Sequence, residues 1–409
     1  MKKPRASICL ILLCWFVYAS SYLGKVNYAA NVNQVMGFFN VDHGSAGLVS
    51  TFFFFAYGIG QVINGLFCKK YNIKWMVFIS LIVSGSVNLA VAILNNFSII
   101  KYLWLFNGIS MSFLWPNLIR LLSETVSKKD IPKATAVMGT TVATGTVLVY
   151  ATSALFAKIN FKLSFYVPAV LFMAVALVWI FSVSNLVEKV KSEVQESTEN
   201  AITESKKEPF NKTVLLLTIG VFAFFGVATN LIKDGLTTWV PSILKERYNL
   251  DESLSIVLTL LLPIVAMFAN VFAIMVHKKI IDFIVQCGLM FLISGVIIGG
   301  VICSISLNLF IITLIGFTVV CFLISSCNSV ITSIFPLFMK DKVNSGKMAG
   351  ILNGFCYLGS TISSYGLGSV ADNFGWTAVF YVLLAVCVIV VLVSLIYLLI
   401  KKSILKKSV

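Results

Sequence analysis

The chain has 409 residues, of which 59% are hydrophobic and only 11% are charged. Soluble domains carry about 25% charged residues, so this composition excludes an ordinary soluble protein and indicates that the lipid bilayer is the solvent for most of the chain. The net charge of +15 comes from lysines in short gaps between apolar runs. That pattern is typical of membrane orientation and not of nucleic-acid binding.

Apolar runs long enough to cross a membrane need about 20 residues each. Twelve such runs predict an all-α membrane protein with twelve transmembrane helices. Lys2, Lys3 and Arg5 before the first run imitate a signal peptide, but the further runs favour an uncleaved first helix. The predicted spans, in chain order, are 6–36, 46–68, 75–95, 99–123, 134–158, 163–186, 213–247, 252–277, 280–303, 307–339, 346–370 and 376–400.

Lysine and arginine are unevenly divided between the two sides of the predicted spans. The termini, the loops after spans 2, 4, 6, 8 and 10, and the span ends beside those loops hold 24 of the 31 basic residues. Because basic loops stay in the cytoplasm, this bias predicts cytoplasmic termini and an even number of spans. The lysine-rich composition and brief loops favour a bacterial plasma membrane.

Residues 187–212 break the apolar pattern with 11 charged residues in 26. We predict a cytoplasmic linker there, at most weakly helical, between a six-helix half at 1–186 and a second half at 213–409. The halves resemble repeats of a kind common in transporters. Five matches occur in order at shifts of 208 to 220, namely Leu23-Gly24-Lys25 with Leu231-Ile232-Lys233, Lys69-Lys70 with Lys278-Lys279, Lys133 with Lys347, Phe165-Tyr166-Val167 with Phe380-Tyr381-Val382, and Pro116 with Pro336.

Motifs for catalysis, cofactors and metals are missing from the sequence. The two histidines and nine cysteines form no HExxH, CxxC or other ligand spacing, and no nucleophile elbow or phosphate loop occurs. We therefore predict that the protein is not an enzyme and uses no cofactor or metal.

Lys25 and Lys233 are the sharpest functional signal. Each lies about 20 residues into the first span of its half, so both are predicted at similar depth in the membrane. A buried intramembrane charge is costly and by default faces a cavity, although a lysine can also snorkel to the interface. Two facing lysines favour an anionic ligand, because the ligand stabilises the charged form of both.

Asp234 is the only acidic residue in the interior of a predicted span, since the others lie in loops, in the linker or at span ends. It adjoins Lys233 and is expected to point elsewhere on the helix. Two roles stay open, a proton relay and a partner that keeps the empty site neutral by pairing with a lysine. Further substrate-binding candidates are polar or aromatic residues within the spans, which could equally stabilise helix packing, namely Tyr22, Tyr28, Tyr57, Gln61, Trp115, Asn230, Trp239 and Tyr357.

The chain resembles the major facilitator superfamily and, within it, the organophosphate:phosphate antiporters. Tyr22-Leu23-Gly24-Lys25 and Leu231-Ile232-Lys233-Asp234-Gly235 stand where that group has its two substrate-binding basic residues. Other similar stretches are Trp115-Pro116 with Arg120, Phe165-Tyr166-Val167-Pro168-Ala169 and Cys356-Tyr357-Leu358-Gly359-Ser360.

The resemblance implies alternating access and exchange of a phosphate ester or sugar phosphate for phosphate. The family's basic residues are usually arginines, so the lysines leave phosphate selectivity less assured. The glycerol-phosphate type has a histidine near Thr144 and a lysine at Gln61, both missing here. Two alternatives therefore stay open, a proton-coupled symporter of a carboxylate or other organic anion, and a transporter-like membrane sensor. The expected partners are a small anionic solute and lipid, with no nucleic acid, and a monomer is the expected functional unit.

Overall fold

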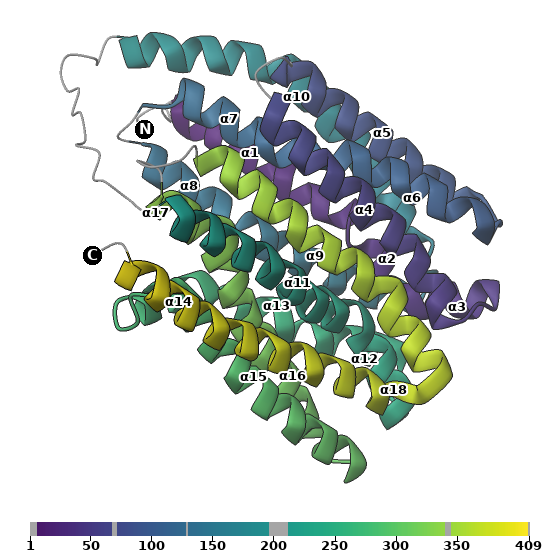
Figure 1. The fold of residues 1–409 in the computed structure, drawn as a ribbon. Helices are drawn as coiled ribbons and strands as arrows, with labels where there is room; N and C mark the ends of the chain where they lie inside the picture. Colours follow the sequence, from purple (N-terminus) through teal and green to yellow (C-terminus); the bar gives the residue numbers. More distant parts are fainter. Residues whose placement is uncertain (1–5, 68–71, 128–129, 196–211, 340–344, 408–409) are drawn as a thin grey trace.

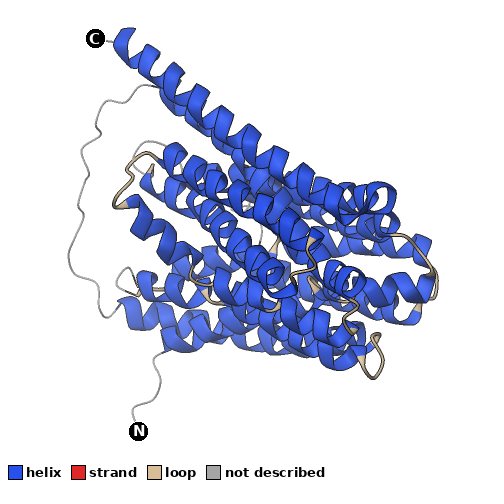
Figure 2. Ribbon diagram, turned by 90° about the horizontal axis from the view of Figure 1, so that it is seen from below, coloured by secondary structure: helices blue, strands red, loops and turns tan. Residues whose placement is uncertain are grey.

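The computed structural model describes residues 6–67, 72–127, 130–195, 212–339 and 345–407. Figure 2 shows helices and loops and no strand within that part of the chain. Eleven described helices are long and apolar enough to cross a membrane, and the last, Lys347–Ile404, contains two predicted spans joined at Gly375. Gly375 has φ 78° and ψ 169°, a backbone conformation open to glycine, so the chain turns there between the two spans. The prediction of an all-α protein with twelve membrane-spanning segments is confirmed.

The first half contains six spans, three of which are interrupted. Its helices are α1 (Ala6–Ser21), η1 (Tyr22–Gly24), α2 (Asn27–Ala30), α3 (Val32–Phe39), α4 (His43–Phe67), α5 (Ile73–Ile93), α6 (Phe97–Ser112), α7 (Leu114–Thr125), α8 (Ile131–Gly139), α9 (Thr141–Ala157) and α10 (Leu163–Gln195).

The second half also contains six spans, but its first span is unbroken. Its helices are α11 (Lys212–Tyr248), α12 (Glu252–Thr259), α13 (Leu261–Ala266), α14 (Ala269–His277), α15 (Phe283–Ser306), α16 (Phe310–Ser329), η3 (Val330–Ile334), α17 (Phe335–Phe338) and α18 (Ser345–Lys407).

Two boundaries differ from the sequence-based expectation. The predicted first span 6–36 is broken after Ser21 and again near Ala30, and its last helix ends at Phe39. Helix α10 continues to Gln195, so residues 187–195 are helical where we expected linker. A charged stretch can extend an established helix beyond the bilayer, since its polar side chains are solvated there. The rest of the linker, 196–211, and the Lys69-Lys70 repeat motif lie outside the described residues.

Asparagine residues begin or end several helices at the loops between spans. Asn72 and Asn96 accept hydrogen bonds from the backbone nitrogens two residues further on and so begin α5 and α6. Left-handed residues follow other helices, with φ of 51° at Asn40, 52° at Asn249 and 57° at Asn308. Asparagine tolerates this conformation better than most residues, which explains why tight turns form at these points.

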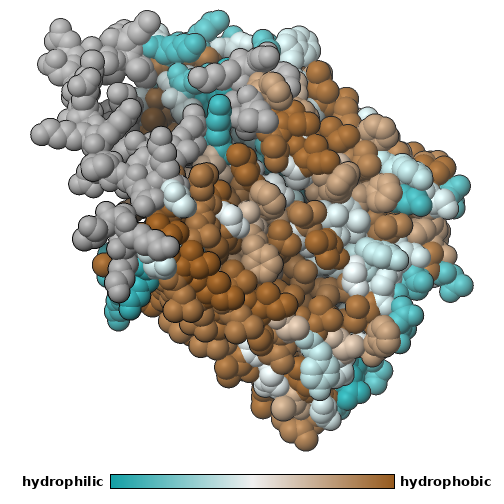
Figure 3. All heavy atoms as spheres, in the orientation of Figure 1, coloured by the Kyte–Doolittle hydropathy of each residue, from teal (hydrophilic) through white to brown (hydrophobic). Residues whose placement is uncertain are grey.

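The first turn of α1 and the last turn of α18 lie at the same end of the helix bundle, here called the terminal end (Figure 1). Helices α2, α3 and α12 lie toward the opposite end, here called the distal end. Hydrophobic side chains cover most of the middle of the visible surface, and hydrophilic ones gather toward both ends (Figure 3). This distribution fits a bundle surrounded by lipid.

The two halves meet along α4 and α18, which run side by side (Figure 1). A Cβ atom on Gly47 would collide with the backbone carbonyl of Ser364, and one on Gly354 would lie 2.6 Å from Val62. Small residues therefore let the backbones of the two halves approach closely at this seam.

Candidate functional site

A cavity of about 430 Å³ lies between the two halves and contains both cavity lysines that the sequence predicts. Among the described residues that line it, the charged ones are Lys25, Lys233 and Asp234. Their formal charges sum to one positive charge. Polar residues of the second half contribute to the lining, among them Asn270, Ser325, Asn328, Ser329, Thr332 and Ser333.

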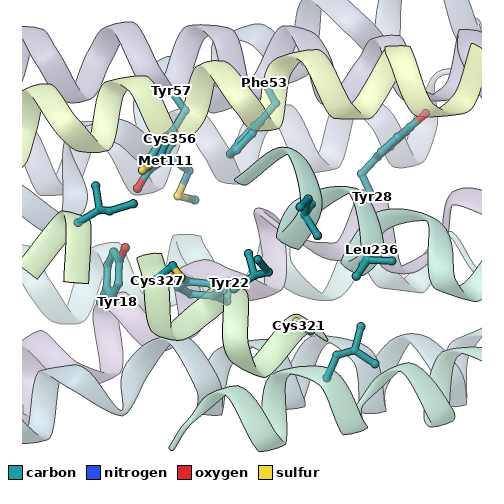
Figure 4. Packing of buried hydrophobic residues seen from close by; sticks show 14 of the residues in the cluster. Tyr18, Tyr22, Tyr28, Phe53, Tyr57, Met111, Leu236, Cys321, Cys327 and Cys356 are labelled. Atoms are coloured by element: carbon teal, nitrogen blue, oxygen red, sulfur yellow. The ribbon is translucent and has the colours of Figure 1, made fainter. Parts of the chain in front are cut away.

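Lys25 lies between η1 and α2, where the first span is not helical. Its Nζ atom lies 4.0 Å from the ring centroid of Tyr57, 5.2 Å from that of Tyr22 and 5.5 Å from that of Tyr357. It also lies 3.5 Å from the Tyr357 hydroxyl, to which it donates. Three aromatic rings thus stabilise the ammonium group by cation–π attraction. Figure 4 shows Tyr22 and Tyr57 among the side chains at the centre of the bundle.

The break beside Lys25 is stabilised by asparagines from other spans. The Gly24 carbonyl accepts a hydrogen bond of 2.8 Å from the Asn107 side chain and one of 3.3 Å from Asn88. Asn27 in turn donates to Asn88 at 2.8 Å. A backbone carbonyl freed from helical bonding is costly inside a membrane unless it has a partner, so these amides explain how the break is tolerated.

Lys233 has a different environment inside the unbroken helix α11. Its Nζ atom lies 3.3 Å from a carboxylate oxygen of Asp234. The other carboxylate oxygen accepts a short hydrogen bond from the Ser360 hydroxyl. Ser360 also accepts from Asn230 at 3.1 Å, and Asn230 accepts from Asn328 at 2.7 Å. Asp234 is therefore tied to Lys233 at one oxygen and to a polar chain that reaches α18 and α16 at the other.

The expectation that Asp234 points away from Lys233 is wrong. Neighbouring residues do not face each other on a helix surface. The lysine has four rotatable bonds, however, and its ammonium group bends back to the carboxylate. The pairing proposed from the sequence as one of two roles for Asp234 is present in the structure.

The structure gathers six of the sequence-predicted residues in the cavity lining, namely Tyr22, Lys25, Trp115, Lys233, Asp234 and Tyr357. Tyr57 contacts Lys25 from α4, and Asn230 reaches the lining through Asn328. Their roles in substrate binding stay predictions.

Three other candidates make structural contacts away from the lining. The Tyr28 hydroxyl donates to the Ala46 carbonyl at 2.9 Å, and Gln61 donates to the Ser112 carbonyl at 3.0 Å. Trp239 is buried, with its ring centroid 5.5 Å from that of His43. Each of these side chains joins helices, which is the alternative explanation that the sequence left open for intramembrane polar residues.

Sequence reasoning did not select Ser360 or the serines and threonines of α16 and η3 as site residues. The sequence feature that could have identified Ser360 is its position within the predicted eleventh span. Serine is common at ordinary helix contacts, so residue type alone carries little information here.

Hydrogen bonds between the halves wall the cavity on the distal side. Ser242 donates to the Asn33 side chain at 2.6 Å, and Ser253 donates to the Ala154 carbonyl at 2.9 Å. The Tyr150 hydroxyl donates to the Thr237 carbonyl at 2.8 Å. These contacts join α3 and α9 of the first half to α11 and α12 of the second.

A transmembrane bundle with two six-span halves, a central cavity and one intramembrane lysine from each half has the layout of a secondary transporter. The sequence profile of the Major Facilitator Superfamily matches residues 14–364. The chain belongs to this superfamily. The prediction of the superfamily from sequence is confirmed, and the match places the protein among membrane transporters.

Curated relatives are distant in sequence. A "Probable hexose phosphate transport protein" of Chlamydia pneumoniae is 21% identical over 406 residues, which cover 92% of this chain and 88% of the relative. The "Membrane sensor protein UhpC" of Escherichia coli is 23% identical over 121 residues, which cover 30% of this chain and 28% of the relative.

Among solved structures, the fold is similar to a bacterial homologue of the human lysosomal transporter Spinster. The TM-score is 0.76 at 13% identity, and the match covers 99% of both chains. This likeness shows the major facilitator fold and nothing about the solute.

Proposed function

We propose that this member of the Major Facilitator Superfamily carries a small organic anion across the bacterial plasma membrane by alternating access. The favoured solute is a phosphate ester such as a sugar phosphate, exchanged for inorganic phosphate. The observation that carries the proposal is that Lys25 and Lys233, from different halves, line one cavity. A ligand that binds both joins the halves through its own charge, as a transported solute must.

Charge balance favours an anion. With Asp234 in place, the cavity holds one uncompensated positive charge in surroundings of low dielectric constant. A bound anion neutralises this charge and receives charge-assisted hydrogen bonds, which are about twice as strong as neutral ones. Because the empty cavity lacks that compensation, reorientation without a ligand is expected to be slower than exchange.

The similarity to hexose phosphate transport proteins over 92% of the chain supports a phosphorylated solute. Lysine binds phosphate as a point charge and does not form the paired hydrogen bonds of arginine. Carboxylates therefore stay within the chemistry of the site, and the experiment below has to compare both classes.

Orientation and assembly are part of the proposal. The first turn of α1 and the last turn of α18 lie at one end of the bundle (Figure 1). The basic loops on that side predict that it faces the cytoplasm. The cavity is complete within one chain, so we propose that a monomer transports.

The test is ligand-induced thermal stabilisation of the purified protein, followed by exchange in proteoliposomes. The ligands are phosphate, glucose 6-phosphate, glycerol 3-phosphate and a dicarboxylate. We expect phosphate esters to stabilise the wild type and to exchange for internal phosphate. The Lys25→Gln/Lys233→Gln double variant should do neither.

Lys158→Gln is the matched control, because Lys158 is exposed at the distal end of α9. It should behave as the wild type. Stabilisation by carboxylates alone, with uptake that an uncoupler abolishes, would replace the exchanger by the symporter. Ligand binding equal in the double variant and the control would refute the two-lysine site.

A sensor is the second candidate, and the partial similarity to a membrane sensor protein favours it. A sensor binds the anion at the same cavity but does not release it on the other side. Saturable binding without exchange or net uptake, in vesicles where binding is lost in the double lysine variant, would identify that function.

A further inference from the structure

His43 connects the two halves at the distal end through both of its ring nitrogens. It begins α4 in the first half, and its partners belong to α11 and α18 of the second half. Nδ1 lies 2.6 Å from a carboxylate oxygen of Asp372, and Nε2 lies 2.7 Å from one of Glu246. The side chain is 14% exposed. The ring centroids of Trp239 and Trp376 lie 5.5 and 5.1 Å from that of His43.

Both nitrogens of His43 meet groups that act as acceptors. An ionised carboxylate accepts hydrogen bonds only, and a neutral imidazole has one N–H donor. Two contacts of this length therefore require one extra proton within the group of three residues.

The other bonds of the two carboxylates place this proton on the imidazole. Asp372 also accepts from the backbone nitrogens of His43 at 3.2 Å and Gly44 at 2.7 Å. Glu246 accepts from the Trp376 indole nitrogen at 2.9 Å with its second oxygen. Carboxylates that accept several hydrogen bonds are stabilised in the ionised form. The closed distal end is thus held by an imidazolium between two carboxylates.

We propose that His43, Glu246 and Asp372 form a proton-binding site that locks the distal end, so that the proton on His43 is released when the two halves separate there. This site is separate from the cavity lysines and from Asp234. It makes pH a determinant of the conformational equilibrium even without solute.

Two basic residues flank Glu246 in the sequence, Lys245 and Arg247, and the Arg247 guanidinium donates to the Ile305 carbonyl at 3.0 Å. Lys245 precedes Glu246, but its ammonium group lies 2.5 Å from Glu252. Asp42 precedes His43, and hydrogen bonds from Ser45 lower the pKa of its carboxyl group. Loss of the proton from His43 therefore leaves a cluster of negative charges at the seam. Like charges repel, so the closed arrangement loses stability relative to the separated one.

Linkage gives the size of the effect. If the closed form binds one proton more than the open form, the ratio of closed to open molecules changes by at most about tenfold per pH unit. The change falls where histidine titrates, within or just above the range of about pH 5 to 8. The sign follows from the structure, since a rise in pH opens the distal end.

The experiment measures distal-end separation by single-molecule fluorescence transfer in lipid nanodiscs without solute. Dyes are attached to cysteines introduced by Ile159→Cys and Leu307→Cys. The native cysteines are replaced by serines in this background. Ile159 and Leu307 lie in distal loops of different halves, and each is 69% exposed. We expect the open fraction to increase from pH 5.5 to 8.5, over about three pH units of the linkage relation.

His43→Gln should be mostly open at every pH, because one amide donor cannot serve two carboxylates. His277→Gln is the matched control, since His277 is the other histidine of the sequence and lies at the end of α14. It should keep the wild-type pH response. An equal pH response in His43→Gln, or none in the wild type, would overturn the proposal.

A second variant covers the case in which His43→Gln does not fold. In Glu246→Gln/Asp372→Asn each side chain keeps one acceptor oxygen, but the charges that hold the imidazolium are gone. The pH response should shrink at least severalfold. A response of wild-type size would contradict the proposal, and the outcome does not depend on which anion the protein carries.

Discussion

Lys25 and Lys233 occupy matching positions in the two halves of the sequence, yet their surroundings differ. Lys25 lies at a break in its helix and contacts tyrosine rings. Lys233 lies in an unbroken helix and pairs with a carboxylate. Both arrangements keep a lysine charged at the centre of a membrane protein. The ring contacts leave the charge of Lys25 available to a ligand, whereas Asp234 already neutralises Lys233.

This difference suggests a division of labour within the proposed site. An incoming anion gains most from Lys25, which has no ion-pair partner among the described residues. At Lys233 it must compete with Asp234. Removing either lysine changes the total charge of the cavity equally, so charge count and environment can be separated by mutation.

The largest expected effect comes from single neutralisation of the two lysines. Lys25→Gln should weaken anion binding by about 10- to 100-fold, the range of a lost charge-assisted hydrogen bond. Lys233→Gln should also weaken it strongly, because Asp234 is then unpaired and repels the anion. Titration calorimetry or thermal shift with the preferred ligand measures both.

The asymmetry appears when Asp234→Asn is added to each variant. It should restore binding in Lys233→Gln to within about tenfold of the wild type, since the remaining charge is again +1. Added to Lys25→Gln, it should restore anion binding much less. Lys233 then carries the remaining positive charge, but its position lacks the ring contacts that Lys25 makes. Equal rescue in both backgrounds would show that only net charge matters.

Substitution of the residue that precedes each lysine should have an intermediate effect. A Cβ atom on Gly24 would collide with the Phe172 ring and lie 2.8 Å from the Asn88 side chain. Ile232, its counterpart, is fully buried. Gly24→Ala should therefore destabilise by overpacking, about 1–3 kcal/mol.

Ile232→Ala should destabilise the protein by forming a cavity, about 2–5 kcal/mol. Thermal unfolding of the purified proteins compares the two variants. Only Gly24→Ala should also lower ligand affinity in proportion, because the strain is adjacent to the broken segment that positions Lys25. Normal affinity in Gly24→Ala, with reduced stability, would argue against that coupling.

The smallest effect belongs to the aromatic ring closest to Lys25. Tyr57→Leu removes a cation–π contact of about 0.5–2 kcal/mol, so ligand affinity should change by about 2- to 30-fold. Tyr57→Phe keeps the ring and should change it less. If both substitutions change ligand affinity equally, the hydroxyl rather than the ring is the important group. The exchange assay can measure this comparison.

Hydrophobic length and the placement of basic residues were enough to predict the helical fold and the twelve spans. These features depend on composition averaged over many residues, and the bilayer selects strongly on them. The break after Ser21 was not predictable, because Gly24 is stabilised there by Asn88 and Asn107 from other spans.

The candidate site was predictable only in part, for the same reason. A charge inside a span is visible in the sequence, so Lys25, Lys233 and Asp234 could be selected. Which polar residues line the cavity depends on helix rotation, and Gln61 turns out to bond the Ser112 carbonyl instead. The contacts of His43 could not be predicted from the sequence, because Asp372 is 329 positions away.

The Gly24 carbonyl has a consequence for how the protein moves. Straightening the first span would return this carbonyl to a helical partner and leave the amides of Asn88 and Asn107 without one of their acceptors. Buried amides without hydrogen-bond partners are costly, so we expect the break in the first span to stay rigid and not to act as a hinge. The first half should then move as one rigid body that carries Lys25 with it. Conformational change during the transport cycle should concentrate at the seam between α4 and α18.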